Sequence, residues 1–248
     1  MPMLEGRRDW RPAGLGPPRF LCRIRQSGGN GMADELPLFP LNVVLFPGMA
    51  LPLHIFEPRY REMIALCSDE QRPFGVLLIR EGKEVGEPAT PFDVGTTAEI
   101  VHLERLDDGR MNVITIGTRR FHLLRYSTEK KSYLVGDVEL LEDPDPPDVA
   151  RALGKEVAGL AQRYVTIIQT ATARDLVPLD IPDSPLGTSF VVASALRVEN
   201  AQRQELLEIT AVVDRLSKEK EILASEIARV EALLRERNAG AFGPFSRN

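Results

Sequence analysis

Histidines, cysteines and paired carboxylates are the side chains that most often carry catalysis or bind metals, and here they are few and scattered. The three histidines, His54, His102 and His122, lie on separate segments, and no H-x-x-x-H or C-x-x-C spacing occurs. Cys67 lies on the apolar face of a predicted helix without a positioned base, which makes it a poor nucleophile. We therefore expect no metal, no cofactor and no catalytic residue.

Two further patterns could carry chemistry, and each has a plainer explanation. Asp107 and Asp108 form a carboxylate pair, but Asp107-Asp108-Gly109 is typical of a hairpin turn. Gly154-Lys155 has no partnering glycine, so the G-x-x-x-x-G-K-[ST] spacing that cradles the phosphates of ATP is absent. We expect the chain not to be an enzyme in its own right.

The elements that position these residues are organised around the stretch 36–63. A long helix is excluded there by Pro37, Pro40, Pro47 and Pro52. The apolar residues between these prolines predict short buried strands, and Pro47-Gly48 fits a type II turn. Pro58 is well placed at the first position of a helix whose inward face carries Tyr60, Met63, Ile64 and Cys67.

The chain then alternates turn signals with β-rich runs. Strands are predicted at 74–79, 96–106, 110–118, 121–126 and 133–141, with a surface loop at 80–94. Gly117 falls where a strand would bend or bulge. Several strands, one helix and tight turns favour a closed or half-closed β-barrel, an arrangement that removes exposed edges.

Helical periodicity begins after the proline-rich acidic connector at 142–147, with Asp148 as the predicted N-cap. One apolar stripe contains Leu153, Val157, Leu160, Tyr164 and Ile167. Gly154 and Gly159 in the same helix permit a close approach of a neighbour. After a loop marked by prolines, Asp183 or Ser184 is expected to cap a short helix that ends near Arg197.

The last predicted helix runs from about Asn200 to Arg237. Its apolar positions keep a strict 3-4 spacing, interrupted at Lys220, through Leu206, Ile209, Val213, Leu216, Leu223, Ile227, Val230 and Leu234. This pattern predicts a coiled-coil seam that projects from Lys220 onward or pairs with another copy through residues 206–234. The alternative is that the helix folds back within the helical domain.

The chain is therefore predicted to be an α+β protein in four parts. Residues 1–33 are expected to be a disordered extension, with Met32 as an alternative translation start. Residues 34–142 form the β-barrel domain, 143–238 form a helical domain that ends in the long coiled-coil-like helix, and 239–248 form a frayed tail. No apolar run is long enough to span a bilayer, and the two cysteines suggest a reducing, cytoplasmic location.

Charge bears on the partners of the barrel. Residues 33–143 carry 12 basic and 19 acidic side chains, so this segment should repel nucleic acid unless a basic patch intervenes. The densest basic cluster consists of Arg119, Arg120 and Arg125 around Phe121. It could meet phosphate or an acidic peptide, although such arginines more often pair with nearby carboxylates.

The opening stretch resembles the start of the Lon protease N-terminal domain. The L-P-L-x-P-L-x-x-V-x-F-P-G-x-x-L-P-L pattern is matched from Leu36 to Leu53, and agreement continues at Val94-Gly95-Thr96, Asp108-Gly109, Gly117 and Arg120. The resemblance extends roughly from Leu36 to Leu234 and implies a PUA-like pseudo-barrel that recognises substrates. The ATPase and peptidase modules of a full Lon protease are not matched, so the implied protein is a free-standing LON domain.

This resemblance implies a non-catalytic module that binds unfolded or extended polypeptide, or an adaptor or regulator of a protease complex. The candidate peptide-binding residues are Phe46, Leu53, Ile55, Phe56, Arg59 and Tyr60, with Arg59 or Arg61 fixing the orientation of the peptide. The first alternative is a PUA-like RNA-binding module that uses the arginine cluster. The second is a scaffold that self-associates through the last helix.

Overall fold

The computed structural model describes residues 34–241 except 85, 87, 88, 130, 145 and 174–177. The predicted disordered extension at 1–33 and the last seven residues of the predicted tail, 242–248, lie outside the described residues. Within the described ranges, no helix is both long and apolar enough to cross a membrane.

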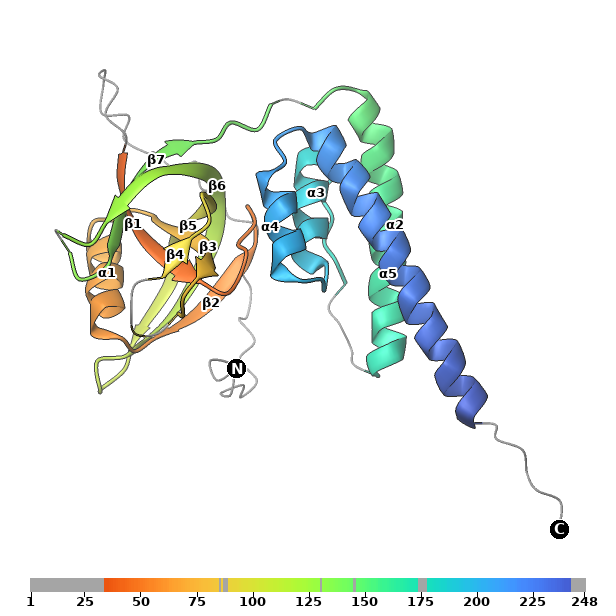
Figure 1. The fold of residues 1–248 in the computed structure, drawn as a ribbon, viewed down its shortest axis with the longest axis horizontal. Helices are drawn as coiled ribbons and strands as arrows, with labels where there is room; N and C mark the ends of the chain where they lie inside the picture. Colours follow the sequence, from red (N-terminus) through yellow and green to blue (C-terminus); the bar gives the residue numbers. More distant parts are fainter. Residues whose placement is uncertain are drawn as a thin grey trace, which may run out of the picture. The chain divides into compact units, whose positions relative to one another are not determined.

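The first half of the described chain forms a closed β-barrel (Figure 1). Its strands are β1 (Asp34–Leu41), β2 (Ala50–Ile55), β3 (Phe74–Glu81), β4 (Thr90–Pro91), β5 (Val94–Arg105), β6 (Met111–Ser127) and β7 (Leu134–Leu140). The strand order is β1-β7-β6-β5-β3-β4, and a parallel β1–β3 pairing closes the ring. β2 lies outside this ring and pairs with β6.

The turn and the helix predicted in the opening stretch are confirmed. Gly48 has φ +80°, and the Met49 amide donates to the Phe46 carbonyl at 3.0 Å, which closes a turn around Pro47-Gly48. Helix α1 (Pro58–Asp69) begins with the predicted proline and buries Tyr60, Met63, Ile64 and Cys67. α1 therefore contributes its whole apolar face to the barrel core.

The hairpin at Asp107-Asp108-Gly109 is also confirmed, since it joins β5 to β6 and Gly109 has φ +81°. The two strands predicted at 110–118 and 121–126 are instead one strand, β6, because a bulge absorbs the irregularity. Ala98 pairs with Gly117 while Thr96 pairs with Arg120, which leaves one extra residue on β6. A Cβ atom on Gly117 would collide with the Phe46 carbonyl oxygen.

The second half of the described chain contains four helices, namely α2 (Val149–Thr172), α3 (Pro185–Ala195), α4 (Asn200–Glu208) and α5 (Val212–Ala241). Ser184 caps α3, as predicted, by accepting a hydrogen bond from the Gly187 amide at 3.1 Å. Asp148 precedes α2 but makes no side-chain cap. In α2 the predicted stripe is only half right, because Val157 and Tyr164 are buried while Leu153, Leu160 and Ile167 are partly buried.

The buried face of α2 is centred on a neighbouring line of residues that includes Gly154 and Ala161. Gly154 lies against Pro185 of α3 and Leu216 of α5, where a Cβ atom would be in ordinary contact distance. Gly159 is exposed with nothing near it, so the predicted close approach holds for Gly154 alone of the two.

The prediction of a single helix from 200 to 237 is wrong. The chain leaves the helical conformation at Ile209 and re-enters it at Val212, and a long coiled-coil helix is not formed. The last carbonyls of α4 accept hydrogen bonds from arginine side chains, since Leu207 and Ile209 are both contacted by Arg120. At the end of α4, these side chains are therefore the donors to carbonyls that backbone amides would satisfy if the helix continued.

The predicted seam is buried within the helical part and does not project. α5 runs beside α2 (Figure 1), and its apolar side chains Leu216, Leu223, Ile227 and Val230 belong to the same core as those of α2. Lys220, the predicted polar interruption, pairs with Glu156 of α2 at 2.7 Å. Near the end of α5, Arg237 donates to the carbonyl of Ala171 at 3.1 Å. The alternative, folding back within the helical domain, is therefore the correct one.

The barrel has hydrophobic clusters of its own, but three of its buried residues join the core of the helices. Val44, Phe46 and Leu78 of the barrel cluster with the buried faces of α2, α3, α4 and α5. Two hydrogen bonds also join α4 to the barrel: Gln204 donates to the Val94 carbonyl at 3.0 Å, and Asn200 donates to the Asn42 carbonyl at 2.8 Å. The described residues accordingly belong to one compact unit.

Candidate functional site

The three arginines of the predicted basic cluster do not form one patch. Arg120 is fully buried, whereas Arg125 is 84% exposed and pairs with Asp137 on β7. Arg119 is exposed, and its backbone amide and carbonyl are hydrogen-bonded to the hydroxyl of Thr97 on β5. Alternation along β6, combined with the bulge, sends the neighbouring side chains in different directions. The surface that an RNA-binding module would need is therefore not made by these residues.

Arg120 instead joins the barrel to the helices. Its guanidinium donates to the carbonyls of Leu207 at 2.6 Å and Ile209 at 3.1 Å, and to Asp143 Oδ1 at 2.7 Å. Three acceptors from two segments satisfy most of this buried cation, which would otherwise be costly to remove from water. Arg120 is thus a structural anchor and is not available to a ligand.

Two charged residues of α5 complete this buried junction. Arg215 donates to Ser189 Oγ at 2.5 Å and to the Ile209 carbonyl at 2.7 Å, and its guanidinium lies 4.2 Å from the Phe190 ring centroid. Burial, followed by the positive charge of Arg120, lowers the pKa of Arg215 to about 10.

Glu219 lies one turn further along α5 and is fully buried. Burial raises the pKa of its carboxyl group well above the usual range, although the charge of Arg215 and the hydroxyl of Ser189 act in the opposite direction. Arg215 and Glu219 were not predicted from the sequence, although they form an i, i+4 pair of opposite charge beside the apolar stripe. The same pattern usually marks an exposed helix face, so the pattern alone does not reveal burial.

The predicted peptide-binding residues divide into a buried and an accessible group. Phe46, Ile55 and Tyr60 are 0%, 2% and 6% exposed and fill the core, so the expectation that they lie on a surface patch is wrong. Phe46 is covered by the helices, and its ring lies 5.6 Å from the Arg203 guanidinium of α4. Burial raises the pKa of Tyr60 to about 12, which keeps its hydroxyl neutral.

The accessible group lies at the end of β2 and the start of α1. Phe56 is 38% exposed and Leu53 is half-buried. Arg59 is held by contacts with its neighbours, since its Nε donates to Glu57 at 3.0 Å and its guanidinium lies 4.6 Å from the Tyr60 ring centroid. Phe56 and Leu53 therefore stay candidates for binding a polypeptide.

Polar side chains form a connected row across the outer face of β2, β6 and β5. His54 Nδ1 lies 2.8 Å from Asn112 Oδ1, and Asn112 Nδ2 donates to Glu104 at 2.9 Å. Because an amide oxygen can only accept, the imidazole proton lies on Nδ1, and Nε2 can accept from Arg110 at 3.4 Å. The His54 and Phe56 ring centroids are 6.4 Å apart. We call Ala50, Pro52, His54 and Phe56 the β2 surface.

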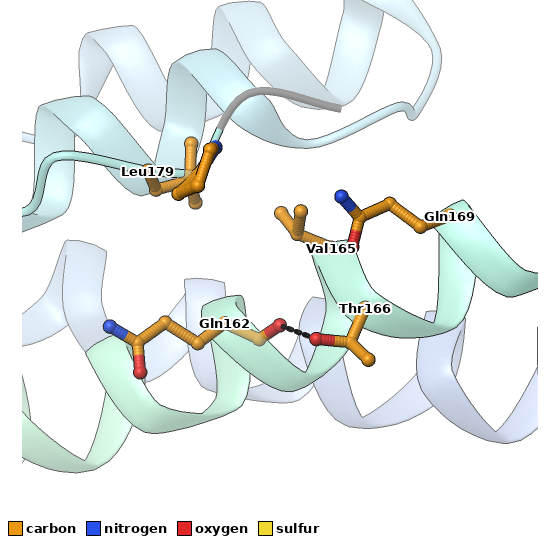
Figure 2. A pocket seen from close by; sticks show the side chains of 6 residues that line it. Gln162, Val165, Thr166, Gln169 and Leu179 are labelled. Atoms are coloured by element: carbon orange, nitrogen blue, oxygen red, sulfur yellow. Dashed lines mark hydrogen bonds between the residues drawn. The ribbon is translucent and has the colours of Figure 1, made fainter. Parts of the chain in front are cut away.

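A separate pocket of about 200 Å³ lies on the helical part (Figure 2). It is lined by Gln162, Val165, Thr166, Gln169, Pro178 and Leu179. Thr166 donates to the Gln162 carbonyl at 3.0 Å, as the dashed line shows. The described side chains that line it are uncharged, so they offer no charge complementarity for an ionic ligand.

The chemistry of the remaining reactive side chains is unfavourable for catalysis. Cys67 is 1% exposed, and burial raises the pKa of its thiol to about 11, which keeps it protonated at neutral pH. Asp108 is engaged at the hairpin tip, where the Arg110 backbone amide and side chain lower the pKa of its carboxyl group. Among the described residues, no group of three or more His, Cys, Asp or Glu side chains could hold a metal ion.

Comparison with known proteins finds Lon proteases among the relatives of this chain. The chain is 28% identical over 198 residues to the Lon protease of Halothermothrix orenii and 30% identical over 205 residues to that of Rhizobium meliloti. These alignments cover 78% and 81% of this chain but 25% of each relative. The chain therefore spans about a quarter of the length of the curated relatives it matches.

Solved structures agree with this relationship. The crystal structure of a Lon N-terminal domain protein from Xanthomonas campestris matches with a TM-score of 0.57 and 27% identity, over 75% of this chain and 96% of that one. The N-terminal domain of the Mycobacterium avium complex Lon protease matches with a TM-score of 0.61 over 77% of this chain and 98% of that one. The second match, at 19% identity, shows a shared fold.

The family model of the ATP-dependent protease La (LON) substrate-binding domain matches residues 35–225, which includes every strand after the first residue of β1 and most of the helical part. The chain belongs to the ATP-dependent protease La (LON) substrate-binding domain family.

Proposed function

We propose that this chain is a non-catalytic recognition module that binds unfolded or extended polypeptide, and that it acts in the cytoplasm as an adaptor or regulator of a proteolytic complex. The observation that carries the proposal is the substrate-binding family match along residues 35–225. The β2 surface supports it, since an exposed aromatic ring beside a strand is suited to contact an apolar segment.

The other two functions considered from the sequence have less support. An RNA-binding module would need a basic patch, yet Arg120 is buried and Arg125 is paired with Asp137. A scaffold that self-associates through residues 206–234 would need an exposed seam, yet Leu216 and Leu223 of this seam pack against α2 and α3.

Binding to a permanently unfolded protein tests the proposal. Fluorescence anisotropy should detect complexes with labelled, reduced and carboxymethylated lactalbumin, and the folded form of lactalbumin should not compete. Phe56→Ser should weaken this binding, because it removes an exposed apolar ring without opening a core cavity.

Leu124→Ser is the matched control, since Leu124 is 54% exposed on a different stretch of β6. It should leave the affinity unchanged. Absence of any complex with the unfolded protein, at concentrations where the wild-type chain is folded, would reject the proposed function.

A further inference from the structure

β2 has an open edge. The barrel ring is closed by β1, β7, β6, β5 and β3, and within the described residues β2 pairs with β6 alone. Residues 111–116 of β6 lie between β5 on one side and β2 on the other. One side of β2 is therefore hydrogen-bonded to the barrel, and its other side has no partner strand among the described residues.

The pairing register identifies the backbone groups that point to the open side. The Gly117 amide donates to the Met49 carbonyl at 2.9 Å, and the antiparallel register continues to Ile55 opposite Met111. In such a ladder the backbone groups of alternate residues face the same way. Backbone hydrogen-bonding groups therefore point towards β6 at Met49, Leu51, Leu53 and Ile55. Those of the residues between them point to the open side.

Pro52 is one of the residues whose backbone faces the open side. This agrees with the assignment, because a proline in a strand is tolerated where no amide hydrogen is needed. The open edge accordingly offers the amides of Ala50 and His54 as donors, and the carbonyls of Ala50, Pro52 and His54 as acceptors. All three residues are exposed. The two donors lie four residues apart, which spans about 14 Å along a strand.

We propose that the open edge of β2 binds an extended segment of a client polypeptide as an added β-strand, with Phe56 contacting an apolar side chain of that segment. This inference rests on the proposed function and specifies how the client is held. An unfolded polypeptide has free amides and carbonyls in the spacing that an open edge requires. Half-buried Ile114 and Ile116, opposite Pro52 and Ala50, extend the apolar character of the outer face.

Pro52 determines which occupant is favoured. If two copies of β2 paired in an antiparallel manner with full overlap, Pro52 would face Pro52, and neither would supply a donor at the centre. A client segment without proline uses its own amide to reach the Pro52 carbonyl. Pro52 therefore disfavours the pairing of two copies of β2, but it leaves the edge available to an unrelated extended chain.

Amide hydrogen exchange of the wild-type chain, with and without reduced and carboxymethylated lactalbumin, tests the inference. The amides of Ala50 and His54 should exchange rapidly in the free protein and become protected in the complex. Those of Leu51, Leu53 and Ile55 should be protected in both. Binding without protection at Ala50 and His54 would overturn strand addition and leave the proposed function standing, whereas the absence of binding would overturn both.

Substitutions at His54 separate the backbone from the side chain. His54→Pro removes an edge donor and should weaken binding roughly three- to tenfold, since one hydrogen bond contributes about 1 kcal/mol. His54→Ala keeps the amide and removes only the imidazole, so it should lose less affinity than His54→Pro. Pro52→Ala adds the missing central donor and should strengthen binding by a factor similar to the loss in His54→Pro. Equal losses in the two His54 variants would contradict the inference.

Discussion

Replacement of Arg120 by methionine should strongly destabilise the protein. The guanidinium makes hydrogen bonds of 2.6, 2.7 and 3.1 Å to Leu207, Asp143 and Ile209, and its side chain is fully buried. Methionine has a similar length and is apolar, so the change isolates the charge and the donors.

The magnitude follows from these contacts. Three hydrogen bonds from a charged donor contribute about 1.5–3 kcal/mol each, or about 4.5–9 kcal/mol in total. Part of this loss is offset, because methionine needs no desolvation of a cation and the repulsion between Arg120 and Arg215 disappears. Asp143 keeps only a distant partner, since Arg215 lies 3.9 Å away. We expect a net loss of about 3–5 kcal/mol in the free energy of unfolding.

Urea unfolding followed by circular dichroism at the helical signal measures this loss. Arg125→Met is the matched control, because Arg125 lies on the same strand but is 84% exposed in its pair with Asp137. The control should change stability by less than about 0.5 kcal/mol. A loss below about 1 kcal/mol for Arg120→Met would show that the junction does not depend on this cation, and the account of the α4–α5 break would fail with it.

Three further outcomes are expected. Since burial raises the pKa of Glu219, the folded protein holds a proton that the unfolded chain has lost above a pH of about 4.3, so wild-type stability falls as the pH rises from there towards the raised pKa. Glu219→Gln lacks this loss, and its urea midpoint relative to wild type should rise between pH 5 and pH 8; a constant difference would contradict burial of the carboxyl group. Gly117→Ala should cost about 1–3 kcal/mol in urea unfolding, because its Cβ would meet the backbone of Phe46, whereas exposed Gly159→Ala should be neutral or stabilising. In a Cys22→Ser background, Cys67 should react with a thiol reagent at pH 8 no faster than the protein unfolds, and rapid stoichiometric labelling of the folded chain would show that the thiol is accessible.

Local signals in the sequence determined much of the barrel. Pro47-Gly48 and Asp108-Gly109 specify turns through φ, and Pro58 specifies the start of α1, because these preferences act within a few residues. The apolar face of α1 follows from its period, so Tyr60, Met63, Ile64 and Cys67 were assigned correctly. The motif that spans Leu36 to Leu53 was sufficient to identify the family.

The tertiary structure alone decided which residues are accessible. Phe46 and Phe56 have the same side chain and lie ten residues apart, yet the helices cover the first and leave the second 38% exposed. Likewise, the 3-4 spacing of apolar residues in α5 is compatible with packing against a helix of another copy or against α2. Only the tertiary structure shows that α5 packs against α2.

The junction and the open edge show why long-range contacts could not be read from the sequence. Arg120 donates to the carbonyl of Ile209, 89 residues further along the chain, at the end of α4, and nothing in the local sequence around Ile209 predicts that contact. The edge of β2 is open because β6 pairs with β2 before it turns to β7, which is a property of strand order and register. Periodicity determined which faces are apolar, and packing determined which of those faces and edges meet water.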